Sequence, residues 1–152
     1  TNEIGVFEMC DTGLREVPNP SEVMLSGRPI NAPGTCVSCV MQGSRPILAE
    51  VQALLSPSSA NQARRTANGV DFNRFKPPDK PIGEDLAAIG EVGLTGEIRS
   101  VPSINQRLQE IARLGFKRCV IPAHCKDDIK LPNGMKLLPA KNVRDAVTAI
   151  FI

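Results

Sequence analysis

The densest local positive charge in the sequence comes from three arginines, Arg64, Arg65 and Arg74, with Lys76 and Lys80 close by. Arginine binds phosphate oxygens through paired hydrogen bonds, and neighbouring hydroxyl and amide side chains can also donate to phosphates. The chain carries 18 basic and 16 acidic residues, so bulk charge does not select a nucleic-acid partner. Any such site must be a local patch. This cluster is the candidate, and solvated arginines on a loop and a strand edge are the alternative interpretation.

Cysteine and histidine give little support for metal or catalytic chemistry. The five cysteines are an odd number, which argues against a disulfide framework and favours a reducing compartment. Cys36 and Cys39 have zinc-ligand spacing but no second pair, so structural thiols are the preferred interpretation. His124 is the only histidine, and its polar stretch lacks a partner at motif spacing, which favours a surface role. Because the sequence has no P-loop, we expect no ATP site.

The length of 152 residues suits one domain. No apolar run is long enough to span a bilayer, and the N-terminus lacks the regions of a signal peptide. We therefore expect a soluble, unprocessed protein with no membrane partner.

The most regular stretch of the sequence predicts a β-β-α-β unit. Extended runs at 87–94 and 97–101 flank Thr95–Gly96, which predicts a hairpin. Ser103 and Gln106 match a capping box, and the apolar spacing predicts an amphipathic helix over 103–114. A β-branched run at 118–121 follows as a strand. Solvated roles are expected for Arg99, Arg107 and Arg113 in this unit.

Five further elements are predicted from local patterns. They are a hairpin at 3–9 and 13–17, a short helix to Ser26 capped by Asn19, a hairpin at 35–41 and 46–55, a strand at 135–138, and a last helix at 142–151 capped by Asn142. The sum is an α+β domain with a mixed or antiparallel sheet of β-hairpins and at least two amphipathic helices.

Several motifs together resemble one protein family. They are GEVGLTGEIR at 90–99, RLGFKR at 113–118 and VIP at 120–122, with NEIGVFEM at 2–9, NPSE at 19–22, QALLSPSS at 52–59 and RRTA at 64–67. In combination they resemble the C-terminal domain of the RadA (Sms) DNA repair family, which is itself similar to the proteolytic domain of Lon protease. The resemblance covers nearly the whole chain and implies a Lon-proteolytic-domain-like fold.

The sequence departs from the family pattern after Arg74. The family continues with a long apolar helix, a strand and a segment opening another helix, whereas this chain has three prolines within 75–81. Either a deletion or a gene model that skips coding sequence would explain this difference. Because the missing helices would have covered one face of the sheet, we expect an apolar face to be left uncovered. We expect residues 1–152 to form a single Lon-like domain that is incomplete in its centre. Residues 1–30 would connect it to an absent ATPase core, and 75–86 would be a proline-rich junction.

The resemblance also implies a function. It implies a non-catalytic DNA-binding and oligomer-assembly domain of a DNA repair and recombination protein, whose parent family is a hexameric, DNA-dependent ATPase that promotes branch migration. The implied partners are DNA, other copies in a ring, and recombination proteins. ATP and zinc would belong to other parts of such proteins, so no cofactor is expected here. The implied location is the cytoplasm with the nucleoid, or an organelle in a eukaryote.

A degenerate Lon-type peptidase domain is the alternative. Such peptidases use a serine activated by a lysine, and the resemblance places Asn105 at or near that lysine, with Arg107 two residues on. Neither side chain can serve as the base. The serines at 56, 58 and 59 form no nucleophile motif. A chain with no activity of its own is the third interpretation.

Overall fold

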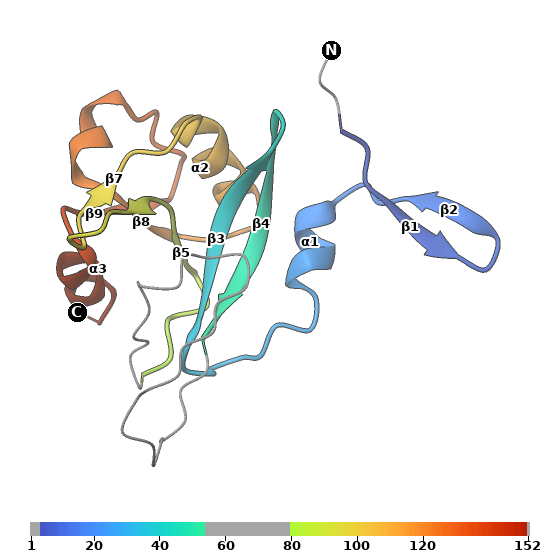
Figure 1. Ribbon diagram of the computed structural model, residues 1–152, viewed down its shortest axis with the longest axis horizontal. Coiled ribbons are helices and arrows are strands. Elements are labelled where there is room, and N and C mark those ends of the chain that lie inside the picture. Colours follow the sequence, from blue (N-terminus) through green and yellow to red (C-terminus); the bar gives the residue numbers. More distant parts are fainter. Residues whose placement is uncertain (1–3, 54–79, 152) are drawn as a thin grey trace.

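The computed structural model describes residues 4–53 and 80–151. Figure 1 shows a central sheet with helices on both sides and an N-terminal hairpin that projects away from it. The elements in chain order are β1 Phe7–Cys10, β2 Gly13–Glu16, α1 Pro20–Leu25, β3 Thr35–Gln42, β4 Arg45–Gln52, β5 Leu86–Ala88, β6 Glu91–Val92, β7 Ile98–Arg99, α2 Ile104–Arg113, β8 Arg118–Pro122, the 3-10 helix η1 Ala123–Asp128, β9 Lys136–Ala140 and α3 Val143–Phe151.

Five strands form the central sheet in the order β4-β3-β5-β8-β9. β3 and β4 are antiparallel neighbours, whereas β3, β5, β8 and β9 all run parallel. The connection from β5 to its parallel neighbour β8 contains α2, as parallel pairing requires a crossover. The structure confirms the predicted α+β class with a mixed sheet.

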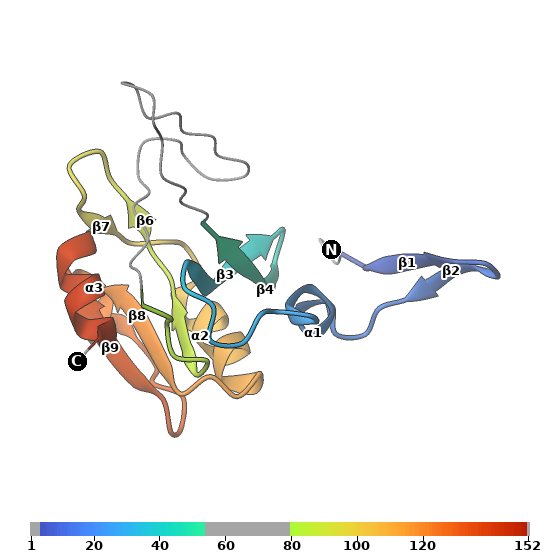
Figure 2. The same ribbon diagram turned by 90° about the horizontal axis from the view of Figure 1, so that it is seen from below.

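The two longer helices cover opposite faces of the sheet, as Figure 2 shows. Leu108 and Ile111 of α2 are fully buried against one face, and Ala146 and Ile150 of α3 pack on the other. The cluster under α2 comprises Val37, Cys39, Leu48, Ala87, Ile89, Leu108, Ile111, Phe116, Cys119, Ile121 and Met135, and the cluster under α3 comprises Leu86, Ile98, Val120 and Ala140. Successive side chains of β5 and β8 point to opposite faces of the sheet, so each of these strands contributes residues to both clusters.

The predicted helix ends are mostly confirmed. The side chain of Asn19 accepts from the backbone N–H of Glu22 (3.4 Å), and that of Asn142 accepts from the N–H of Asp145 (2.9 Å). Gly115 follows α2 with φ +87°, a left-handed conformation that ends a helix at little cost in glycine. The predicted capping box at Ser103 is not formed. Ser103 has φ 59° and its side chain makes no capping hydrogen bond, because an N-cap hydroxyl reaches the helix only from an extended backbone.

The run at 87–94 is not one hairpin strand. Leu86–Ala88 pairs in parallel within the central sheet, and only Glu91–Val92 pairs with Ile98–Arg99. The chain changes direction at Gly90, whose φ is +154°. A Cβ there would lie 2.7 Å from the Ile98 side chain, so glycine permits the close approach.

Part of the α3 face remains open to solvent. A groove of about 220 Å³ lies between α3 and the β6–β7 hairpin. Its lining is apolar and comprises Ala88, Ile89, Gly90, Val92, Ile98, Val120, Val143, Ala146, Val147 and Ile150. Among the described residues, no helix combines the length and apolar character needed to cross a membrane.

Candidate nucleic-acid interface

The three arginines predicted to bind nucleic acid, Arg64, Arg65 and Arg74, lie outside the described residues. The structure does fix the two ends of the stretch that carries them. The N–H of Ala53 donates to the carbonyl of Gly34 (2.8 Å), and Pro81 forms an isolated bridge with Pro33. Both ends therefore meet beside the residues that lead into β3.

Positively charged residues line the edge of the sheet where these ends meet. Because β3, β5, β8 and β9 are parallel, their first residues lie along one edge. In register, Arg118 lies opposite Lys136, and the N–H of Lys136 donates to the carbonyl of Lys117 (2.7 Å). Arg28 reaches the carbonyl of Glu84 just before β5 (3.3 Å). We call Arg28, Lys80, Lys117, Arg118 and Lys136 the basic edge.

Not every cation of the basic edge is available to a ligand. Arg118 forms an ion pair with Asp85 (2.8 Å), and the hydrogen bond between them lowers the pKa of the carboxyl and raises that of the guanidinium. The guanidinium of Arg28 also lies over the ring of Phe116, 5.6 Å from its centre. Within the described part of the chain, no ion pair is found for Lys80, Lys117 or Lys136. The charge of Lys117 nevertheless acts on the nearby Asp85 carboxyl and is one of the causes that lower its pKa.

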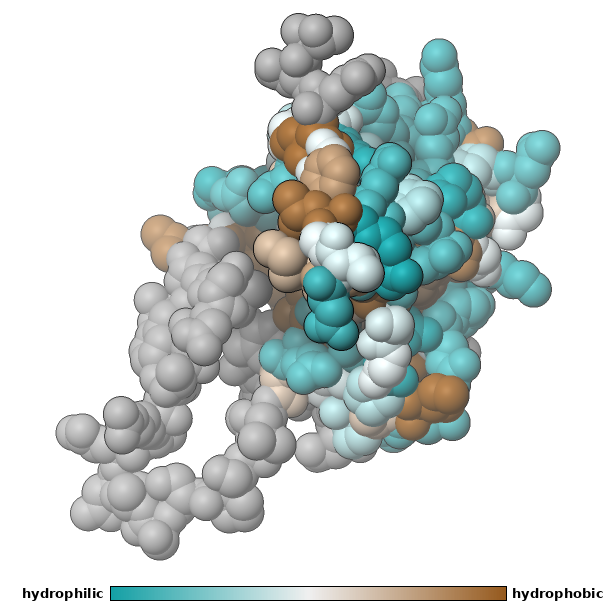
Figure 3. Space-filling model, turned by 90° about the vertical axis from the view of Figure 1, so that its right-hand side faces the viewer, coloured by the Kyte–Doolittle hydropathy of each residue, from teal (hydrophilic) through white to brown (hydrophobic). Residues whose placement is uncertain are grey.

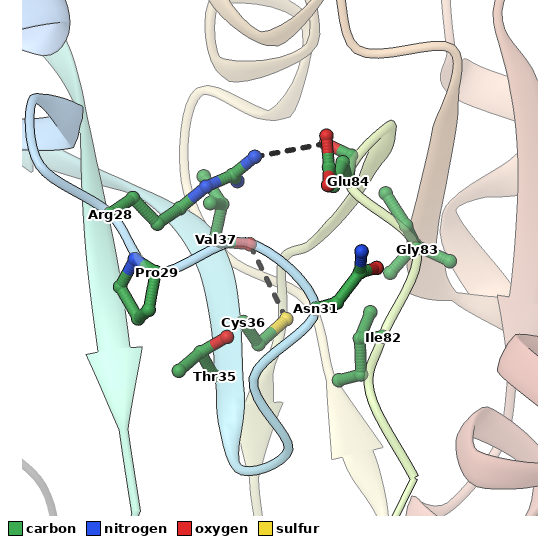
Figure 4. A pocket seen from close by; sticks show the side chains of 10 residues that line it. Arg28, Pro29, Asn31, Thr35, Cys36, Val37, Ile82, Gly83 and Glu84 are labelled. Carbon is green, nitrogen blue, oxygen red and sulfur yellow. Dashed lines mark hydrogen bonds between the residues drawn. The ribbon is translucent and has the colours of Figure 1, made fainter.

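A small polar pocket adjoins the basic edge (Figure 4). Its volume is about 20 Å³, enough for a water molecule but not for a nucleotide. Arg28 and the thiol of Cys36 both line it. Burial raises the pKa of Cys36 to about 11, and its thiol donates to the carbonyl of Val37 (3.6 Å). A thiol held protonated in this way is a poor nucleophile.

The candidate zinc pair does not form a metal site within the described residues. Cys36 and Cys39 lie three residues apart on β3 and so belong to opposite faces, and Cys39 is fully buried under α2. No group of three metal-ligating side chains is found in the described ranges. None of the five cysteines, all of which lie in the described ranges, forms a disulfide, and burial raises the pKa of Cys119 to about 12. His124 is exposed in η1.

The positions compared with the Lon-type catalytic lysine have structural roles. The side chain of Asn105, in the first turn of α2, accepts from the backbone N–H of Lys130 (2.9 Å). Arg107 was predicted to be solvated, and this prediction is wrong. Its side chain is buried, donating to the carbonyl of Pro102 (2.9 Å) and to the carbonyl of Cys39. The serines at 56, 58 and 59 lie outside the described residues.

The other two arginines of the central unit are solvated as predicted. Arg99 pairs with Glu97, and Arg113 pairs with Glu110 (2.8 Å); more than half of each arginine side chain is exposed. Sequence reasoning missed Lys117 and Lys136, because 19 positions separate them in the chain and only the parallel pairing of β8 with β9 brings them together.

Comparison with known proteins identifies relatives over nearly the whole chain, although no protein-family model matches it. The chain is 38% identical to the DNA repair protein RadA of Bacillus subtilis (strain 168), over 97% of this chain and 42% of that protein. It is 37% identical to the DNA repair protein RadA of Streptococcus pyogenes serotype M1, over 99% of this chain and 43% of that protein. The chain thus spans about two fifths of the length of these relatives.

The alignments are longer than the chain. The match to the B. subtilis protein extends over 192 positions, whereas the chain has 152 residues, so at least 40 aligned positions contain no residue of this chain. A missing internal segment stays a prediction. Over nearly its whole length, the chain is a homologue of a segment of the proteins named DNA repair protein RadA.

Proposed function

We propose that this chain is a DNA-binding and oligomer-assembly domain of a RadA-like DNA repair protein, with no catalytic site of its own. The observation that carries the proposal is a spatial one. The stretch with Arg64, Arg65 and Arg74 begins and ends at the basic edge, which adds three lysines without described ion-pair partners. Homology to proteins named for DNA repair supports a nucleic acid as the ligand.

Binding in this proposal is directed at the DNA backbone. Each arginine or lysine that neutralises a phosphate releases counterions, so affinity should fall steeply with salt and depend little on base sequence. Each contact removed should lower the slope of log affinity against log salt by about one. If the positive charge were dispersed over the surface, the loss of DNA affinity would not be confined to substitutions of particular residues.

Fluorescence anisotropy with duplex DNA at several salt concentrations tests this. We expect Arg64→Ala/Arg65→Ala to lower the salt slope by about two, and Lys117→Ala/Lys136→Ala to lower it as well. Arg99→Ala/Arg144→Ala is the matched control. These two arginines lie beyond the carboxyl ends of the parallel strands. The N–H of Ile98, next to Arg99, donates to the carbonyl of Lys141 just after β9 (2.9 Å), and Arg144 lies in the first turn of α3. Arg107 cannot serve as a control because it is buried.

Two outcomes would count against the proposal. Equal losses in the test and control variants would indicate a diffuse field around the molecule. Unchanged binding in Arg64→Ala/Arg65→Ala would remove the cluster from the site.

For the whole protein, we propose a Lon-like domain within a DNA-dependent ATPase that assembles as a hexameric ring and promotes branch migration beside recombination proteins. ATP and zinc would bind to other parts of such a protein, which would be associated with the nucleoid. Sedimentation of this chain with and without DNA tests the assembly role. A monomer under all conditions would leave only the DNA-binding role.

A peptidase function receives no support from the described residues, because the amide of Asn105 holds the backbone of Lys130 and cannot act as a base. Incubation with a serine-reactive fluorophosphonate should label nothing. Specific labelling of any serine would restore the peptidase alternative.

A further inference from the structure

The turn that leads into β9 contains the sequence Asn133–Gly134. Both residues are exposed, and the N–H of Met135 donates to the carbonyl of Pro132 across the turn (3.3 Å). Gly134 has φ +75°, which glycine adopts without strain, and a Cβ built on it would have no neighbour within 4 Å. The space around the peptide bond between Asn133 and Gly134 is therefore open.

An asparagine followed by glycine can lose its side-chain amide without an enzyme, and asparagine is among the thermolabile residues of proteins. The backbone nitrogen of the glycine attacks Cγ of the asparagine and gives up its proton, and the side-chain nitrogen leaves as ammonia. The product is a succinimide ring. Water then opens the ring at either carbonyl, which yields aspartate or isoaspartate. The whole reaction consumes a water molecule, releases ammonia and needs no oxidant or reductant.

The turn leaves both reacting groups accessible. The attacking nitrogen must be able to rotate towards Cγ, and a hydrogen bond that holds either group would slow this step. Among residues 4–53 and 80–151, no hydrogen bond of the Gly134 N–H or of the Asn133 side chain is found. Local opening of an exposed loop costs little free energy. The turn can therefore reach the reactive geometry while β9 stays folded.

The other asparagines of the described ranges lack this combination. Exposure to water does not separate them, because hydrophilic residues are widespread on the surface, as one face of the molecule in Figure 3 shows, and Asn31 is exposed as well. The residue that follows does separate them. Asn19 precedes a proline, whose nitrogen carries no hydrogen, and Asn31 precedes Ala32, whose side chain hinders the attack. Asn105 lies in α2 and Asn142 caps α3, and each side chain accepts from a backbone N–H (2.9 Å in both cases).

We propose that Asn133 is a site of spontaneous deamidation whose product places a carboxylate beside the basic edge. Asn133 lies three residues before Lys136, which begins β9 and lies opposite Arg118 in the register. The N–H of Lys136 also donates to the carbonyl of Lys117 (2.7 Å). A new negative charge at this place would offset part of the positive charge that the basic edge offers to phosphates. The effect on DNA rests on the proposed function, whereas the deamidation does not.

Peptide mapping by mass spectrometry tests the modification. The folded chain is incubated at mildly alkaline pH, because base removes the proton of the attacking nitrogen. Trypsin releases residues 131–136 as a single peptide, so Asn133 is measured separately from Asn68–Gly69, which lies outside the described residues. We expect this peptide to gain the mass change of an amide converted to a carboxyl, at a rate within about tenfold of that in the urea-unfolded chain. Asn133→Gln should abolish the change.

The other four asparagines of the described ranges are the internal controls, and their peptides should stay unmodified in the folded chain. Two results would overturn the site. One is an unmodified peptide 131–136 from the folded chain together with a modified one from the unfolded chain. The other is equal conversion of all five asparagines in the folded chain.

A second measurement tests the effect of the charge. Asn133→Asp reproduces the aspartate product, and we expect it to lower the slope of log affinity for duplex DNA against log salt by up to about one. Gln106→Glu makes the same change of an amide to a carboxylate in the first turn of α2, at the end of that helix away from β8, and should keep the slope. Equal slopes for Asn133→Asp and the parent chain would overturn the effect on the basic edge. If the parent chain does not bind DNA, the proposed function fails, and the peptide map still decides whether Asn133 is modified.

Discussion

Replacing Arg107 with alanine should destabilise the fold although arginine is normally a surface residue. Arg107 is 8% exposed, and its guanidinium donates to the carbonyls of Pro102 and Cys39. Cys39 lies two residues beyond Val37, the last point at which β3 pairs with β5. The guanidinium thus binds a strand carbonyl close to where the neighbouring strand ends.

The magnitude follows from what alanine would leave behind. A hydrogen bond from a charged donor contributes about 1.5–3 kcal/mol, and a buried carbonyl without a donor costs about 1–3 kcal/mol. Pro102 is exposed, so water can replace the lost donor there, whereas the carbonyl of Cys39 is next to the core. We expect a loss of about 2–4 kcal/mol in the free energy of unfolding, or roughly 5–15 °C in Tm. Arg15→Ala, which breaks an ion pair with Glu8 in which both side chains are exposed, should cost about 1 kcal/mol or less.

Urea unfolding followed by circular dichroism measures both variants. Arg107→Met provides a further comparison, because it keeps an apolar stem in the same space and removes only the donors. It should recover a small part of the loss. A value for Arg107→Ala within about 0.5 kcal/mol of the parent chain, or equal to that of Arg15→Ala, would show that the buried hydrogen bonds contribute nothing net.

Three further outcomes are expected. Ser21→Ala should cost about 1–3 kcal/mol in urea unfolding, because the buried hydroxyl both accepts from a backbone N–H of β4 (3.1 Å) and donates to a carboxylate of α2 (2.7 Å). The pKa of Glu97 is lowered from 4.5 to about 2, chiefly by a hydrogen bond from Thr95, so its contribution to stability is present above about pH 4.5 and is lost as the pH falls towards 2. Thr95→Val should move the carboxyl titration seen by NMR to higher pH. Cys39 and Cys119, buried with raised pKa, should react with a thiol reagent at pH 8 only after unfolding.

The elements that could be predicted from the sequence are those fixed by neighbouring residues. Asn19 and Asn142 cap their helices because the cap depends on a side chain and an N–H three residues away. The β3–β4 hairpin pairs Gln42 with Arg45 across a short turn, where local chemistry sets the register. Ser103 shows the limit of such patterns, because its residue type fits a cap and its left-handed backbone does not.

The pairing of distant strands could not be predicted in this way. β5 is only three residues long and joins β3 and β8, which lie on either side of it in the sheet and far from it in the chain. From the sequence alone, the run at 87–94 fits a single hairpin strand. In the structure the bend at Gly90 divides it between β5 and β6. The basic edge depends on the same non-local pairing, so nothing in the sequence indicated that Lys117 and Lys136 lie close together.

Arg107 shows how position and residue type can predict opposite outcomes. The apolar spacing of Ile104, Leu108 and Ile111 defines one face of α2, and position 107 follows Ile104 by three residues and precedes Ile111 by four, so it lies on that face. Its charge predicted exposure, and its place on the helix predicted burial. The carbonyl of Cys39 explains why the arginine is buried. It lies on β3 close to the end of β5, and a long side chain on α2 is needed to donate to it. The pattern of a helix therefore locates its buried face reliably, while the reason for a charge on that face lies in another element.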